Sequence, residues 1–326
     1  MKKLLFAALL AATFTASAQQ AVQPTNRYSM KLTQQADGSY ELMNRARYAR
    51  IVDLEQIDDL LVPYTYERQR LQSRDYKGVE VREPIYTTHE GYELQIAIDL
   101  AQSNEPTPVV FYVHGGGWSR GNNGTFRVLS QYMAKQKGVT GVRIAYTLAP
   151  QPGADVRVSA ADIQAAVQYI RDHAAELNID PSRMGFVGNS AGAHLAAVGA
   201  MTTPEAKAFV GTSGIYDLRT AAICQKTKDA QRIAYFCDRD PKILQATSPA
   251  ALIPKKKAPA ALLFCGTADI TVECAQSKDF ADALRRRGAK VDLRVYENYD
   301  HNLSAKASDK MEEVFFATVD FLAENL

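Results

Sequence analysis

The sequence predicts an α/β fold with a mostly parallel, doubly wound sheet of eight strands and helices on both faces. Two observations support this fold class. Short apolar segments recur from residue 79 to residue 296, and beyond residue 109 helical patterns separate them. In addition, two apolar segments stop at glycine-rich turns, one at Gly115 and one at Gly188, and a helical pattern follows the second.

The expected elements follow in chain order. Strands are expected near residues 79–87, 92–100, 109–113, 140–145, 184–187, 208–212, 260–265 and 290–296. The main helices are expected over 160–175, 191–201, 273–287 and 309–322. We interpret the excursion over 217–258, between the sixth and seventh strands, as a small lid.

The N-terminal residues predict export. Residues 1–18 combine a basic start, a short apolar run and the ending Ala16-Ser17-Ala18, which together are typical of a cleavable signal peptide. We therefore expect cleavage after Ala18 and a periplasmic or extracellular mature protein. The run is too short to remain as a membrane anchor, and no cysteine follows the cleavage site to carry a lipid.

Residues 19–78 form an extension before a catalytic domain over 79–326. Residues 28–33 and 39–43 flank Asp37-Gly38 and predict a hairpin, and residues 53–61 predict a short helix. The extension could cover the sheet edge or form one wall of the acyl pocket. The sequence leaves both roles open.

Composition argues against a polyanionic partner. The chain is 46% hydrophobic and 23% charged, which is the composition of an ordinary soluble globular chain. Its formal charge of +2 falls to zero once Lys2 and Lys3 leave with the signal peptide. A neutral surface gives no electrostatic reason to expect nucleic acid or anionic lipid as a partner. The oligomeric state stays open.

The segment Gly188-Asn189-Ser190-Ala191-Gly192 has the G-x-S-x-G spacing of a nucleophile turn. A short apolar strand precedes it and a helix of small residues follows it. In such a turn the backbone approaches itself too closely for a Cβ atom at Gly188 or Gly192. Ser190 is therefore the candidate nucleophile.

The segment HGGGW, residues 114–118, supplies the complementary half of an acyl-transfer site. Three consecutive glycines after a strand offer unhindered N–H groups to an oxygen that becomes negative during the reaction. We expect Gly116 and Ala191 to stabilise this oxyanion, with Gly115 assisting.

A serine nucleophile needs a base, and the chain has five histidines. His301 is the candidate, because it follows the last expected strand. Of the other four, we expect His89 to be a solvated loop residue and His114 to brace the glycine loop. We expect His173 to lie on the surface and His194 to be a packing residue.

The third member of the triad is an acid that orients the base. Asp269 fits best, because it follows the apolar strand 260–265 and precedes a helix. Asp300, next to His301, is the one rival. Ser190, Asp269 and His301 occur in the order Ser, Asp, His that is expected for an α/β-hydrolase.

From about residue 79 to the C-terminus the chain resembles α/β-hydrolases of the HGGG esterase branch, and in particular secreted bacterial carbohydrate esterases of the acetylxylan and feruloyl type. The resemblance rests on FYVHGGGW, RIAYTLAP, the segment 160–196 with its GNSAG turn, SGIYDL, GTADITV and YDHNL. Cys265 and Ala193 depart from the pattern, where relatives commonly carry histidine and glycine. Neither change removes a catalytic group.

Export makes disulfides plausible among the four cysteines. Of the three possible connectivities, proximity along the chain favours Cys224–Cys237 and Cys265–Cys274. The second bridge would clamp the loop that carries Asp269. The alternative is four reduced, buried thiols.

Together these features predict a secreted serine esterase that deacetylates plant-type poly- or oligosaccharides. The alternatives are a feruloyl esterase, a broad short-chain carboxylesterase and, from another class, a non-catalytic binding protein of the same fold. The chemistry requires no metal or organic cofactor, and the sequence lacks H-E-x-x-H, C-x-x-C and a dinucleotide-type G-x-G-x-x-G. In the lid, bulky side chains either close an acetyl-sized acyl pocket or pack the lid onto the core: Tyr235, Phe236, Ile243 and Leu244.

Overall fold

A computed structural model describes residues 31–34, 40–43, 49–52, 75–305 and 310–326. The chain divides into two compact units, Met1–Tyr66 and Glu67–Leu326. The first unit therefore ends before the boundary expected at residue 78. The signal peptide and the short helix expected over 53–61 lie outside the described residues.

The described part of the first unit is a small antiparallel sheet. Strand β1 (Lys31–Gln34) pairs with β2 (Tyr40–Met43), and Lys31 lies opposite Met43. This pair lies where the sequence predicts a hairpin. A third strand, β3 (Ala49–Val52), pairs with the other edge of β2.

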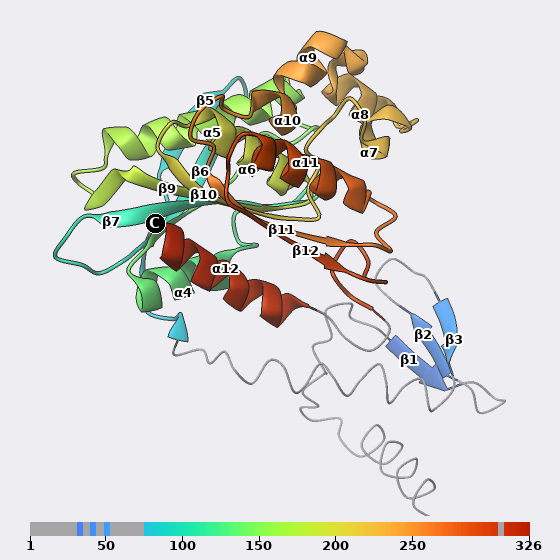
Figure 1. Ribbon diagram of the computed structural model, residues 1–326, viewed down its shortest axis with the longest axis horizontal. Coiled ribbons are helices and arrows are strands. Elements are labelled where there is room, and N and C mark those ends of the chain that lie inside the picture. Colours follow the sequence, from blue (N-terminus) through green and yellow to red (C-terminus); the bar gives the residue numbers. More distant parts are fainter. Residues whose placement is uncertain (1–30, 35–39, 44–48, 53–74, 306–309) are drawn as a thin grey trace, which may run out of the picture. The chain divides into compact units, whose positions relative to one another are not determined.

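The described part of the second unit contains one sheet of nine strands in the order β12-β11-β10-β9-β7-β8-β6-β4, with β5 also pairing with β6 (Figure 1). Strands β7 to β12 run parallel to one another, whereas β4, β5 and β6 form an antiparallel edge. Their bounds are β4 Glu80–Arg82, β5 Ile85–His89, β6 Tyr92–Leu100, β7 Thr107–Val113, β8 Thr140–Ile144, β9 Ile179–Asn189, β10 Ala206–Thr212, β11 Ala260–Gly266 and β12 Val291–Tyr296.

The mostly parallel sheet is confirmed, but the expected count of eight strands is wrong. The single strand expected over 79–87 is two strands, β4 and β5, separated at Glu83 and Pro84. Proline has no N–H group to donate to a strand ladder, so the pairing changes there. The Pro84 carbonyl still accepts a hydrogen bond from the Ile96 N–H (3.1 Å).

Helices cover both faces of the sheet, as expected. Their bounds are α4 Arg127–Tyr132, α5 Val156–Asp172, α6 Ala191–Thr202, α7 Ala222–Gln225, α8 Ala230–Tyr235, α9 Pro241–Ala246, α10 Pro249–Leu252, α11 Cys274–Arg286 and α12 Met311–Asn325. Helix α5 begins four residues earlier than expected, because the Asp155 carboxylate accepts N–H groups of Arg157 and Val158 and caps it there. No described helix has the length and apolar character that crossing a membrane requires.

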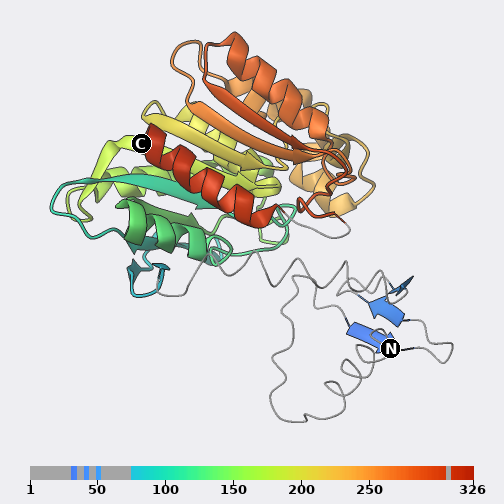
Figure 2. The same cartoon turned by 60° about the horizontal axis from the view of Figure 1, so that its bottom comes forward.

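Strand β7 shows how the two faces form the core. Its alternating side chains divide between two buried clusters, as the period of two in a strand requires. Val109, Phe111 and Val113 pack with residues of α5, α6 and α11. Val110 and Tyr112 pack with residues of α4 and α12, which Figure 2 shows on one face of the sheet.

The lid consists of the short helices α7 to α10, between β10 and β11. Phe236 and Tyr235 pack on Trp118 of the glycine loop, with ring centroids 5.0 Å and 6.2 Å away. The Tyr235 hydroxyl donates to Ser159 Oγ in α5 (2.8 Å). Leu244 is also buried. These bulky residues therefore pack the lid onto the core.

One of the two expected disulfides is confirmed. Cys265 and Cys274 are joined, whereas Cys224 and Cys237 are free thiols, so that pairing is wrong. Cys224 is buried in the core, while the Cys237 thiol interacts with Asp155 and Arg157 at the start of α5. The lid turns the two side chains toward different neighbours.

Candidate active site

Ser190 lies at the sharp turn between β9 and α6. Its backbone has φ 54° and ψ −126°, outside the regions that residues other than glycine usually adopt. A Cβ atom on Gly188 would overlap the Gly192 carbonyl, and one on Gly192 would overlap the Val113 carbonyl at the end of β7. The turn therefore requires both glycines, and it holds the Ser190 hydroxyl at the carboxyl ends of the parallel strands.

His301 and Asp269 reach the same point from two other strands of the sheet, β12 and β11. Asp269 follows β11 and His301 follows β12. His301 Nδ1 lies 2.7 Å from Asp269 Oδ2, and His301 Nε2 lies 2.9 Å from Ser190 Oγ. Because a carboxylate only accepts, Nδ1 carries the proton and Nε2 is left to accept from the Ser190 hydroxyl. The structure thus brings the three expected residues into one hydrogen-bonded line.

The Asp269 carboxylate is also fixed by its own loop. Its other oxygen, Oδ1, accepts the N–H groups of Thr271 (2.8 Å) and Val272 (2.9 Å), and its side chain is fully buried. By contrast, Asp300 accepts the N–H groups of Asn302 and Ser304 and closes a turn. The rival acid is therefore engaged with backbone, whereas Asp269 contacts the base.

The glycine loop departs from the expected donor set in one respect. The Gly115 N–H donates to Asn189 Oδ1 (2.9 Å), so it is already engaged. Within the described residues, the N–H groups of Gly116, Gly117 and Ala191 have no acceptor. Gly116 and Gly117 both have positive φ, 118° and 63°, which explains why glycine occupies these positions.

Two other histidines support the loop. His114 stacks on Tyr146 with ring centroids 4.4 Å apart, and burial lowers its pKa, so it braces the loop as expected. His194 is fully buried, accepts from Trp118 Nε1 (3.2 Å) and donates from Nε2 to the Thr247 carbonyl (2.7 Å). Burial lowers the pKa of His194 to about 4, which keeps the ring neutral.

The solvated position expected for His89 is wrong. Its Nε2 lies 2.7 Å from Asp162 Oδ1, and the second oxygen of this buried carboxylate accepts the Thr147 N–H (2.8 Å). His89 therefore links the end of β5 to α5. His173 lies at the end of α5, where its Nδ1 lies 2.8 Å from the Tyr169 carbonyl.

Asn189 and Trp118 are the supporting residues that sequence reasoning missed. Asn189 is an unspecified position of G-x-S-x-G, and the contact it makes spans 74 residues. Trp118 is the last residue of the HGGGW motif. The motif placed it beside the glycine loop, but nothing in the sequence indicated that it contacts His194.

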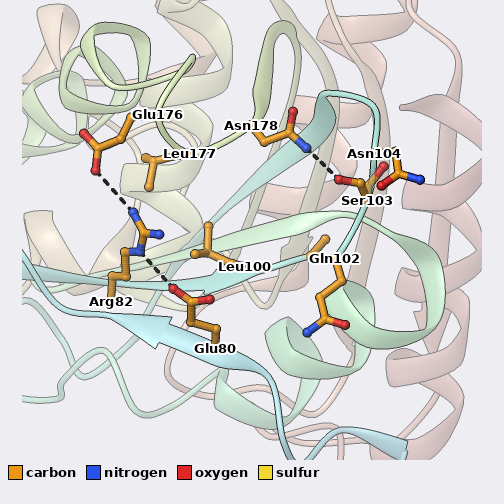
Figure 3. A pocket seen from close by; sticks show the side chains of 10 residues that line it. Glu80, Arg82, Leu100, Gln102, Ser103, Asn104, Glu176, Leu177 and Asn178 are labelled. Carbon is orange, nitrogen blue, oxygen red and sulfur yellow. Dashed lines mark hydrogen bonds and ion pairs between the residues drawn. The ribbon is translucent and has the colours of Figure 1, made fainter.

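A cavity of about 520 Å³ lies elsewhere in the second unit (Figure 3). It lies where β7 and β9 begin, whereas the Ser190 site lies where they end. Arg82 is held there between Glu80 (3.0 Å) and Glu176 (3.2 Å). The residues that line this cavity include no nucleophile paired with a base, so it is not the candidate active site.

Sequence comparisons find similar proteins among known enzymes. A probable isoprenylcysteine alpha-carbonyl methylesterase of Oryza sativa subsp. japonica is 29% identical over 217 residues, which is 60% of this chain and 50% of the relative. A kynurenine formamidase of Salmo salar is 30% identical over 239 residues, 66% of this chain and 72% of the relative. The chain thus spans about half the length of the methylesterase.

A solved structure and a family profile complete the comparison. The butyrate-bound thermophilic esterase Est2 of Thermogutta terrifontis superposes with a TM-score of 0.63 at 25% identity, covering 76% of this chain and 95% of that one. The expected α/β-hydrolase fold is therefore confirmed. Because the BD-FAE profile matches residues 94–284, more than half of the sequence, the chain belongs to the BD-FAE family of α/β-hydrolase esterases.

Proposed function

We propose that this protein is a serine esterase that hydrolyses carboxylic esters through an acyl-enzyme on Ser190. The observation that carries the proposal is the line of hydrogen bonds from Asp269 through His301 to Ser190. The esterase names of the relatives and of the structural neighbour support the same chemistry. A non-catalytic binding protein would not need a serine, a histidine and an aspartate in one hydrogen-bonded line.

In the first step, Ser190 Oγ attacks the ester carbonyl carbon and its proton passes to His301 Nε2. The buried Asp269 carboxylate stabilises the imidazolium through Nδ1. The carbonyl oxygen becomes negative and accepts N–H groups of Gly116 and Ala191, with Gly117 in the place first assigned to Gly115. Removing one such donor typically costs about 3–4 kcal/mol of transition-state stabilisation.

The second half reverses these roles. His301 gives its proton to the leaving alcohol as the tetrahedral intermediate collapses to the acyl-enzyme. Water then enters, His301 Nε2 takes one of its protons, and the resulting hydroxide attacks the acyl carbon. Return of the proton to Ser190 releases the carboxylic acid, so atoms and charge balance over the cycle.

For the substrate, we favour acetyl groups on poly- or oligosaccharides. The resemblance of the motifs to carbohydrate esterases supports this choice. Feruloyl and general short-chain esters are the alternatives.

Hydrolysis of a formamide is a second candidate. It is favoured by the similarity to the formamidase, which is matched over a larger share of its length than the methylesterase is. The same nucleophile and base would serve, with an amine as the leaving group.

We also propose that the protein is exported. The signal-peptide pattern of residues 1–18 supports export. The Cys265–Cys274 disulfide supports it independently, because structural disulfides persist in oxidising compartments.

A substrate panel tests the proposed function. We expect kcat/KM to fall from p-nitrophenyl acetate to butyrate to octanoate, acetylated xylan to release acetate, and methyl ferulate to react poorly. The Ser190→Ala variant is the control for contaminating activity. Efficient methyl ferulate hydrolysis or a preference for octanoate would remove the acetyl assignment. Faster hydrolysis of formanilide than of every ester would favour the formamidase instead.

A further inference from the structure

Arg232 of the lid helix α8 lies beside the glycine loop. Its Nη2 is 3.5 Å from the position that a Cβ atom on Gly117 would occupy. A Cα–Cβ bond adds about 1.5 Å, so the guanidinium lies within about 5 Å of the Gly117 Cα. Gly117 follows Gly116, which contributes to the oxyanion site. Arg232 therefore places a positive charge at the edge of the proposed site.

Contacts at both ends fix the backbone of helix α8, which carries Arg232. The Asp229 carboxylate accepts the Arg232 N–H (2.7 Å) and caps the helix. At the other end, Tyr235 and Phe236 are buried against Trp118, the residue that follows Gly117. The same tryptophan thus fixes the lid helix and the glycine loop relative to one another.

Arg232 as a whole residue is half-buried, and none of its guanidinium N–H groups has an acceptor among the described residues. Other arginines of this protein do have acceptors. Arg82 is held between two glutamates (Figure 3), and Arg239 of the lid donates to the carbonyls of Cys224 and Thr227. A bound anion would give these donors a charge-assisted acceptor.

We infer that Arg232 selects substrates that carry a carboxylate near the scissile ester, such as acetylated oligosaccharides that contain a uronic acid. A guanidinium presents its donors as a planar fork that matches the two oxygens of a carboxylate. Arg120 of the glycine loop is exposed, so water screens its charge and it discriminates less. This inference rests on the proposed esterase function and deepens it by naming the charge of the substrate.

A pair of matched substrates tests the inference. 4-Acetoxybenzoate carries a carboxylate where 4-acetoxybenzamide carries a neutral amide of similar shape. The measured quantity is the ratio of kcat/KM for the anion to kcat/KM for the amide. Comparing this ratio between variants cancels the different intrinsic reactivities of the two esters.

We expect Arg232→Gln to lower the ratio roughly 10-fold or more, through KM for the anion, because a charge-assisted pair of hydrogen bonds is lost. Arg232→Lys keeps the positive charge but lacks the planar fork of donors. Its ratio is expected to lie between those of the wild type and Arg232→Gln. Arg82→Gln is the matched control, because it removes the same charge at the other end of the sheet. Its ratio is expected to equal that of the wild type, and thermal unfolding checks that each variant is folded.

The outcomes separate the two proposals. A ratio in Arg232→Gln within twofold of the wild type overturns the inference while leaving the esterase intact. An equal loss on both substrates also overturns it, because Arg232 would then support the site without reading charge. If the wild type hydrolyses neither ester, nor any ester of the acyl panel, the esterase proposal fails and the inference fails with it.

Discussion

Single residues of the site differ mainly in the hydrogen bonds that they already make. Asp269 and Asp300 both lie in loops after strands, and both are close to His301 in space or in sequence. Only Asp269 contacts the imidazole, while Asp300 closes a turn of backbone. The two carboxylates therefore have different roles, and substituting each one measures the difference in activity.

We expect Asp269→Asn to lower kcat by about 10³–10⁴-fold, because an amide in place of the carboxylate favours the wrong tautomer of His301. Asp300→Asn should lower kcat less than about tenfold, since it alters a turn and not the base. Steady-state kinetics on p-nitrophenyl acetate measures both values. The opposite ranking would assign the acid to Asp300.

The sequence predicted Ser190, Asp269 and His301 because chain order and strand ends restrict them to few positions. It could not predict that Asn189 occupies the Gly115 N–H, because the motif leaves that position free and the contact joins distant segments. His89 was misplaced for the same reason, since its partner Asp162 is 73 residues away.

At the scale of elements, the loop between β11 and α11 is the part most closely tied to activity. The Cys265–Cys274 disulfide joins its two ends, and Asp269 lies between them. A bridge that closes so short a loop is expected to contribute about 2–3 kcal/mol to the free energy of unfolding in the chain-entropy account.

We expect the double variant Cys265→Ser, Cys274→Ser to unfold at a lower temperature and to lose roughly threefold or more in kcat, because the acid becomes less well positioned. Calorimetry and kinetics measure the two effects. Cys237→Ser, which alters a free thiol of the lid, is the control and should retain wild-type kcat. Full activity of the double variant would show that the bridge does not position Asp269.

The positions of helices and strands were predictable where the hydrophobic pattern was long enough to show its period. The expected strands beyond residue 92 and the long helices α5, α6, α11 and α12 were found, with ends shifted by up to five residues. The lid helices α7 to α10 contain four to six residues each, too few to show a helical period. Proximity in sequence gave the wrong pairing for Cys224 and Cys237, because the fold of the lid turns the two side chains toward different neighbours.

At the scale of the whole catalytic unit, His194 connects three parts. It lies one turn after Ser190 on α6, accepts from Trp118 of the glycine loop and donates to Thr247 at the end of lid helix α9. No periodicity could reveal this connection, because it depends on how the lid folds back over α6. A protonated His194 could no longer accept from Trp118.

This connection makes the stability of the protein depend on pH. The pKa of His194 is about 4 in the folded protein and about 6.5 in the unfolded chain, so only the unfolded chain binds the proton between these values. The free energy of unfolding should therefore fall by roughly 3 kcal/mol from this group as the pH drops from about 6.5 to about 4. Urea unfolding at pH 7 and pH 4.5 measures the loss.

His194→Gln isolates this contribution, because glutamine can still donate and accept but does not titrate in this range. We expect the variant to be less stable at pH 7 and to lose less stability than the wild type on acidification. Equal losses in the two proteins would mean that the titration of other groups sets the acid sensitivity.

The central claim, that Ser190 is the nucleophile of an ester hydrolase, is tested most directly by kcat of Ser190→Ala on p-nitrophenyl acetate. The change removes the hydroxyl and little buried volume, so the thermal unfolding temperature should stay close to that of the wild type. We expect kcat to fall on the order of 10⁴-fold or more. A folded variant that keeps more than about a tenth of wild-type kcat would contradict the account.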